Sequence, residues 1–187
     1  LMYKNLGQYD KAENFYLEAL EINKKRYGPT HSEVGTCLDN LGMLYLDQKL
    51  YERAEPLFIE ALRINEENEN KGPNHIDTAA SLNNLAFFYS SLAQFSKAEN
   101  LYLRALEIEK NQLGSNHPYV AKTKNNLASL HLKKGLYEKA QNLFEDSLKI
   151  KSKYFGSNSI KLASVLNNLA TSYNRSGLYR EAEKIYL

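Results

Sequence analysis

The chain has 187 residues, with 24 Lys and Arg against 22 Asp and Glu, and it contains one cysteine. A single cysteine excludes a disulfide framework, and only 9 glycines and 4 prolines argue against disordered, collagen-like and turn-rich all-β chains. No stretch approaches the ~20 apolar residues of a membrane span, no signal peptide opens the sequence, and a net charge of +2 gives no general attraction to nucleic acid. We therefore expect a soluble, cytoplasmic, helix-rich protein.

The sequence repeats itself with a period of about 42 residues. An alanine and, three positions before it, an aromatic residue keep these steps along the chain; the alanines are Ala12, Ala54, Ala98, Ala140 and Ala182. The period predicts one array with a partial repeat (1–27), three complete repeats (28–71, 72–113, 114–155) and a second partial repeat (156–187). The ends lack polar capping segments, so we expect a piece of a longer array.

Each complete repeat predicts two helices and no strand. In the first, apolar residues between 38 and 45 and again between 54 and 62 follow the i, i+3, i+4, i+7 spacing of one helix face. Glycines at 28, 72, 114 and 156 would end the second helix of each pair. The residues expected to cap the next helix are Thr30, Asn74, Asn116 and Asn158.

Small residues recur where the two helices of a pair must approach closely. They are Gly42, Ala86, Ala128 and Ala170 in the first helices and the repeated alanines in the second. One helix pair cannot bury its apolar face alone, so stacking of neighbouring pairs predicts a curved solenoid with a continuous core.

The spacing Leu38-x2-Leu41-Gly42-x2-Tyr45, followed by Ala54-x3-Phe58, resembles the tetratricopeptide (TPR) pattern with Leu in place of Trp. The longer period, and Asn-Asn-Leu-Ala at 83–86, 125–128 and 167–170, resemble the kinesin light chain subgroup of these repeats. The resemblance implies an all-α fold, a right-handed superhelical solenoid of stacked antiparallel helix pairs, with the first helix of each pair on the concave wall.

Opposite the buried stripe of these first helices lies a second stripe of amide, basic and apolar residues, for which we predict a peptide-binding groove. Its residues are Asp39, Asn40, Met43, Asn83, Asn84, Phe87, Lys122, Asn125, Asn126, Lys133, Asn167, Asn168 and Arg175. Asn amides suit the N–H and C=O groups of an extended peptide. The alternative is a merely solvated face, but helix propensity does not explain three exposed Asn-Asn pairs. The resemblance implies ligand contacts at Asn40, Asn84, Asn126 and Asn168.

Charge along this stripe runs from acidic to basic. Asp39 and Asp47 belong to the first complete repeat, whereas Lys122, Lys133 and Arg175 belong to later ones. We expect a ligand with an apolar or aromatic anchor and acidic residues. The resemblance implies the same, since kinesin light chains take tryptophan-and-acidic cargo peptides.

Two positions depart from the repeat: Lys124 replaces a leucine and His131 replaces a tyrosine. Either Lys124 extends past its apolar surroundings and His131 packs like a small aromatic, or both open a polar pocket in this repeat. His31, His75 and His117 occur once per repeat at loop ends, too far apart to share one ion, so we expect no metal and no cofactor.

No phosphate loop, nucleophile elbow or paired-carboxylate motif indicates an enzyme. The sequence therefore predicts a non-catalytic scaffold that binds an extended protein segment, with no nucleic-acid or membrane partner. The alternative is a structural helical-repeat spacer that self-associates through its ends.

Overall fold

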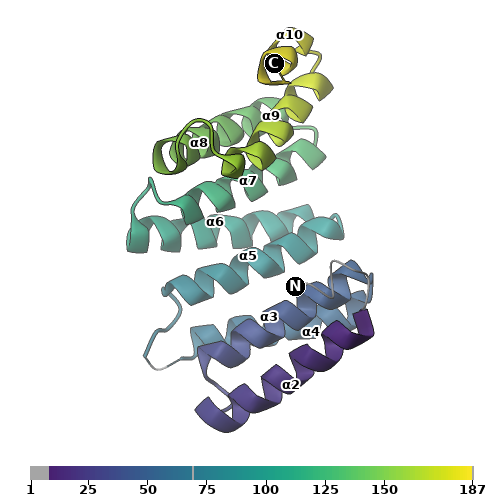
Figure 1. Cartoon of the computed structure of the whole chain (residues 1–187), viewed down its shortest axis with the longest axis vertical. Coiled ribbons are helices and arrows are strands. Elements are labelled where there is room, and N and C mark those ends of the chain that lie inside the picture. The colour runs from purple at the N-terminus through teal and green to yellow at the C-terminus, as the bar shows by residue number, and fades with distance from the viewer. Residues whose placement is uncertain (1–8, 69, 187) are drawn as a thin grey trace. The chain divides into compact units, whose positions relative to one another are not determined.

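The computed structural model describes residues 9–68 and 70–186, and this part of the chain is helical without strands (Figure 1). Nine α-helices follow one another within it: α2 (Tyr9–Tyr27), α3 (Ser32–Asp47), α4 (Tyr51–Glu66), α5 (Ile76–Ser91), α6 (Phe95–Leu113), α7 (Pro118–Lys133), α8 (Tyr137–Phe155), α9 (Ala163–Arg175) and α10 (Tyr179–Tyr186), with a 3₁₀ turn, η1 (Ile160–Leu162), before α9. The all-α helix-pair architecture expected from the repeat is confirmed. None of the described helices has the length and apolar character needed to cross a membrane.

The helices form two compact units, which are considered separately: the first ends at Ser91 and the second begins at Leu92. In the first unit, α3 and α4 pack side by side, as do α2 with α3 and α4 with α5 (Figure 1). Gly42 allows this close approach, because a Cβ added there would lie 3.0 Å from the ring of Phe58. The small residue at this position is therefore a steric requirement of the α3–α4 pair.

The second unit repeats this packing with α7 against α8, α8 against α9 and α9 against α10. Its core contains Ala128, Ala140, Phe144, Val165 and Leu169, all of them almost inaccessible to solvent. The small residues predicted at helix contacts are buried in both units. Each helix pair thus buries the stripe that the repeat marks as apolar.

The turns inside the helix pairs share one C-cap geometry. Leu50 N donates to Tyr45 O at 2.8 Å and Lys49 N donates to Leu46 O at 3.0 Å, which is the Schellman pattern. This motif requires a left-handed residue, and Gly135 and Gly177 supply it in the second unit with φ of 75° and 80°. Lys49 adopts the same conformation at φ 61° although it is not glycine.

The loops between repeats correct one prediction. Glycines 28, 72, 114 and 156 have the expected positive φ. The capping side chain of the next helix, however, is not Thr30, Asn74, Asn116 or Asn158 but the residue that follows each. Nδ1 of the following histidine accepts the N–H two positions later, at 3.2 Å, for His31, His75 and His117; Ser159 Oγ does the same at 3.3 Å. An unprotonated imidazole nitrogen serves here like an Asn or Ser oxygen.

Candidate functional site

The predicted groove residues of the first unit lie on α3 and α5, two helices that contact each other. The doubled Asn or Asp residues occupy two consecutive positions in the first helix of each repeat. We call these the first Asn sites (39, 83, 125 and 167) and the second Asn sites (40, 84, 126 and 168). The two sets of positions differ in burial. Asn40 is exposed and Asn84 half-buried, whereas Asp39 and Asn83 are buried at 6% and 5% exposure. The expectation that all four line an open face is wrong for the two buried residues.

Asp39 is held between α3 and α5. Ser81 Oγ donates to Asp39 Oδ2 at 2.8 Å, and the side chain of Asn84 also hydrogen-bonds the carboxylate. Burial nevertheless raises the pKa of Asp39 to about 6, because the loss of hydration outweighs the two hydrogen bonds that favour the charged form. Asp39 therefore links neighbouring repeats and does not point at a ligand.

Asn83 turns back onto its own helix, where its amide donates to Ala79 O at 3.1 Å. A side chain that bonds the carbonyl four residues earlier is directed along its helix and away from solvent. Of the first-unit groove residues, Asn40, Asn84, Met43 and Phe87 keep some accessible surface. Phe87 is the most conspicuous of these, since 43% of this large apolar residue is exposed.

In the second unit the corresponding face is formed by α7 and α9, which also contact each other. Asn168 Nδ2 donates to Asn125 Oδ1 at 3.3 Å. This bond joins a second Asn site to the first Asn site of the preceding repeat, the same pairing that joins Asn84 to Asp39. We call this recurring pair the Asn ladder. It explains part of the doubled Asn as contact between repeats.

The remaining second-unit groove residues are more open to solvent. Lys122, Asn167 and Arg175 are exposed, and Asn126 is half-buried. Surrounding protein partly desolvates the amine of Lys133 and so lowers its pKa. The face of this unit thus presents three cations among amides.

A second set of contacts between repeats had escaped sequence analysis. Tyr45 Oη donates to Glu13 Oε1 at 2.8 Å, and Tyr89 Oη donates to Glu55 Oε1 at 2.9 Å. Each tyrosine lies on the first helix of a repeat, and each glutamate directly follows the repeated alanine on the second helix of the preceding one. Burial and the neighbouring carboxylate raise the pKa of both tyrosines to about 12. The sequence feature that could have indicated this contact is the glutamate that recurs at 13, 55 and 99.

His131 occupies the tyrosine position of its repeat and faces Glu99, with Nε2 3.8 Å from Oε1. The residue is buried, and burial lowers its pKa although the glutamate opposes this. Lys134 completes the group with an ion pair to Glu99 at 2.7 Å. The simpler interpretation of His131, a small aromatic packed in the core, fits this position.

A third recurring contact joins the ends of α2, α4 and α6 to the first helix that follows each of them. Asn65 Nδ2 donates to Ser81 Oγ at 3.0 Å, so that Asn65 extends the Asp39 network onto α4. Equivalent positions of other repeats pair in the same way; these pairs are Asn23 with Cys37 at 3.1 Å and Glu109 with Thr123 at 2.9 Å. The cysteine thus accepts a hydrogen bond as a small buried residue.

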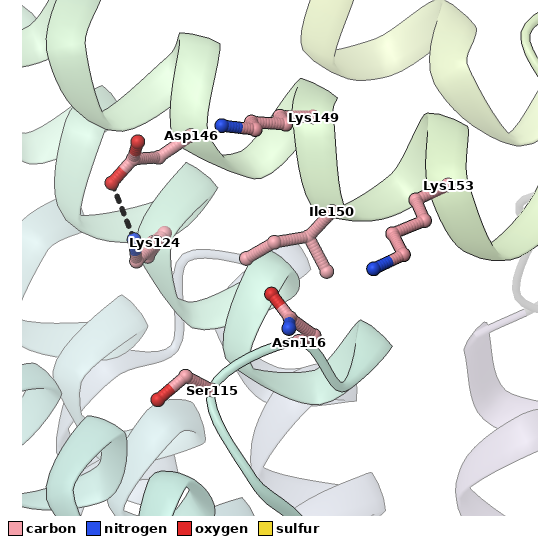
Figure 2. A pocket seen from close by; sticks show the side chains of 7 residues that line it. All are labelled: Ser115, Asn116, Lys124, Asp146, Lys149, Ile150 and Lys153. Atoms are coloured by element: carbon pink, nitrogen blue, oxygen red, sulfur yellow. Dashed lines mark hydrogen bonds and ion pairs between the residues drawn. The ribbon is translucent and has the colours of Figure 1, made fainter.

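For Lys124, the structure agrees with the interpretation that this residue opens a polar pocket. Its amine pairs with Asp146 Oδ2 at 2.5 Å, and both side chains line a polar pocket of about 380 Å³ between α7, α8 and the loop before α7 (Figure 2). His131 does not line this pocket. Within the described residues, no three His, Cys, Asp or Glu side chains are grouped so as to hold a metal ion.

Comparison with known proteins shows what the chain resembles. A family model described as "Tetratricopeptide repeat" matches residues 1–67, 77–153 and 119–187. The comparison with curated protein sequences gives no match.

Solved structures resemble the chain over almost its whole length. The crystal structure of BtubC (BKLC) from P. vanneervenii is 27% identical with a TM-score of 0.80, covering 98% of this chain and 72% of that one. A putative kinesin light chain from P. anserina with nearly identical TPR-like repeats is 22% identical with a TM-score of 0.74, covering 99% and 87%. The structure of MamA protein is 18% identical with a TM-score of 0.58, covering 99% and 82%.

Proposed function

Because the chain belongs to the tetratricopeptide repeat family, we propose that it is a non-catalytic scaffold that binds an extended segment of a partner protein on the exposed face of its first helices. The observation that carries this proposal is the exposed Phe87 among amides on the α3–α5 face. An aromatic ring left accessible beside polar donors is the composition of a recognition surface, where apolar contact gives affinity and the polar groups give orientation.

The first unit supplies an apolar anchor point. Phe87 and the half-buried Met43 lie on contacting helices, and the second-site amides Asn40 and Asn84 lie one turn away on the same two helices. Asn40 makes no side-chain hydrogen bond within the described residues, so its donors and acceptor are available to the backbone of a ligand. We infer that this face accepts an apolar or aromatic side chain of the partner.

The second unit supplies positive charge. Lys122, Lys133 and Arg175 lie on the α7–α9 face, and no carboxylate belongs to the predicted groove residues of these helices. Complementary charge steers association and rejects partners of the wrong sign. The partner segment therefore carries acidic residues that contact this face.

The contacts between repeats bear on the mechanism. The Asn ladder holds Asn84 and Asn168 in fixed orientations before any ligand arrives. Side chains that are already ordered lose less conformational entropy when a peptide binds. Binding is thus preorganised, with the ladder as the support of the second-site amides.

An array of short peptides rich in aromatic and acidic residues, followed by fluorescence anisotropy with the best binders, tests this proposal. Phe87→Ala should weaken binding about tenfold, and Lys122→Glu with Lys133→Glu should weaken it by a similar factor. Matched controls are Ile59→Ala, which truncates an exposed apolar residue on α4, and Lys110→Glu, which makes the same charge change on α6. Both controls should stay within twofold of the unchanged chain.

The alternative is a structural spacer whose ends associate. It would be favoured if no peptide bound with dependence on these side chains while the mass measured by light scattering increased with protein concentration. Equal losses in the groove variants and their controls would also contradict peptide recognition on this face.

A further inference from the structure

The polar pocket of the second unit lies apart from the predicted groove, and none of the residues that line it belongs to the groove set. Its polar lining consists of Ser115 and Asn116 from the loop before α7, Lys124 from α7, and Asp146, Lys149 and Lys153 from α8 (Figure 2). Its volume of about 380 Å³ falls at the lower end of the ~300–1,000 Å³ typical of ligand sites. The pocket is therefore suited to a small polar group.

We propose that this pocket binds a phosphate monoester group. One of its three lysines, Lys124, is neutralised by Asp146, so the lining keeps a net charge of two positive units from Lys149 and Lys153. A phosphate monoester carries about −1.5 to −2 charges at neutral pH and offers three acceptor oxygens. The site thus matches a dianion in both charge and hydrogen-bonding capacity.

The neutral side chains complete the match. Asn116 and Ser115 line the pocket from the loop before α7, and in Figure 2 the Ser115 hydroxyl is directed away from the α8 lysines. An amide N–H and a hydroxyl can both donate to phosphate oxygens, while the lysines contribute point charges. The buried side chain of Ile150 supplies apolar surface to the same pocket.

The cations of this pocket belong to this repeat alone among the complete ones. In the first complete repeat, Thr30 and Glu67, which are equivalent to Asn116 and Lys153, line a pocket whose described lining residues include no lysine or arginine. Lys124 replaces the buried leucines found at 38 and 82 in the other two repeats. Lys149 corresponds to Arg63 and Glu107, and Lys153 corresponds to Glu67 and Asn111, so that neither of the other repeats places two cations here. The fold does not require these lysines, since the equivalent helices form without them.

The lysine pair also differs from a simple helix-end effect. Lys153 lies in the last turn of α8, where a cation is favoured by the helix dipole, but Lys149 lies one turn earlier. In Figure 2 the amine of Lys149 points toward Asp146, whereas the amine of Lys153 points toward Asn116.

The experiment titrates the whole chain with inorganic phosphate at constant ionic strength, following amide chemical shifts by NMR. Residues 115–124 and 146–153 should shift together in a saturable way. Lys149→Gln with Lys153→Gln, both exposed side chains, should weaken binding about tenfold, and Asp146→Asn should strengthen it about threefold because a repelling carboxylate is removed. Lys139→Gln, an exposed lysine of the same helix outside the pocket, is the matched control and should change affinity less than twofold.

A further variant, Lys124→Leu, removes the cation that pairs with Asp146 and should weaken phosphate binding about threefold while the helical circular dichroism stays unchanged. Absence of saturable shifts in the unchanged chain would overturn the proposal, as would equal binding of acetate or an equal loss in the Lys139→Gln control. Capped phosphoserine and a sugar phosphate distinguish the two sources of the group. Tighter binding of the first indicates a phosphorylated side chain, and tighter binding of the second indicates a small metabolite.

Discussion

The buried carboxylate of Asp39 gives a prediction whose sign depends on pH. Asp39 lies between α3 and α5 at 6% exposure, accepts a hydrogen bond from Ser81, and has a pKa raised to about 6 by burial. We predict that Asp39→Asn stabilises the protein at pH 7.5. An amide oxygen can still accept from Ser81, while the cost of burying a charge disappears.

The magnitude follows from the pKa. The pKa rises from 3.8 to about 6, a difference of about two units, and one unit corresponds to about 1.4 kcal/mol. Between these two values the folded chain holds a proton that the unfolded chain has released, so the free energy of unfolding falls as pH rises through this window. Above pH 6 the charged group costs up to about 3 kcal/mol, and below pH 4 it costs nothing.

Urea unfolding followed by circular dichroism at pH 4.0 and pH 7.5 measures this effect. The variant should be more stable than the unchanged chain by about 2–3 kcal/mol at pH 7.5 and equal to it within about 0.5 kcal/mol at pH 4.0. Asp47→Asn, which neutralises an exposed carboxylate at the end of the same helix, is the matched control. Its effect should stay within about 0.5 kcal/mol at both pH values.

Two results would refute this reasoning. A stability difference of the same size at both pH values would mean that Asp39 does not titrate in this window. A loss of stability at pH 7.5 would mean that the ionised carboxylate, with its bonds to Ser81 and Asn84, outweighs its desolvation. Carbon-detected NMR titration of the Asp39 carboxyl distinguishes the two, because it reads the pKa directly.

Three further changes should alter the free energy of urea unfolding. Lys49→Gly should add about 1 kcal/mol by relieving the positive φ, whereas Lys49→Ala, which keeps the strain, should add nothing. Gly42→Val should cost about 2 kcal/mol, because the added side chain meets the Phe58 ring, and an unchanged stability would contradict the contact. His117→Ala should cost about 1 kcal/mol by removing the cap from Tyr119 N, and His117→Asn should recover most of it.

The sequence predicts the fold well because each repeat carries the same pattern of small, apolar and glycine residues. Each copy independently places a small residue at the helix contact and a glycine after the helix, so chance patterns cancel. The caps were predicted one residue too early for a chemical reason. Thr30, Asn74 and Asn116 are common capping residues, whereas the histidines that follow them act through a ring nitrogen that propensity scales rank low.

The candidate site was less predictable, because the side of a helix on which a residue lies does not decide which polar group of a neighbouring helix it bonds. The stripe geometry assigns Asp39 and Asn83 to an open face, but Ser81 and Asn84 of the next repeat bond Asp39, and Asn83 turns back onto its own helix. The bonding of Asp39 depends on the distance between α3 and α5, which no helical wheel of one helix contains. The Tyr45–Glu13 pair likewise joins residues 32 positions apart.

The doubled Asn sites can serve both roles that the sequence left open. An Asn side chain has two N–H donors and an oxygen with two lone pairs. In the Asn ladder, Asn168 uses one donor on Asn125, and among residues 9–68 and 70–186 its second donor and its oxygen have no hydrogen-bond partner. The ladder fixes the plane of the amide, and the free groups of that plane then have a defined direction toward a ligand. In the proposed function, support of the neighbouring repeat and recognition of a peptide are complementary uses of one side chain, and the first makes the second less costly in entropy.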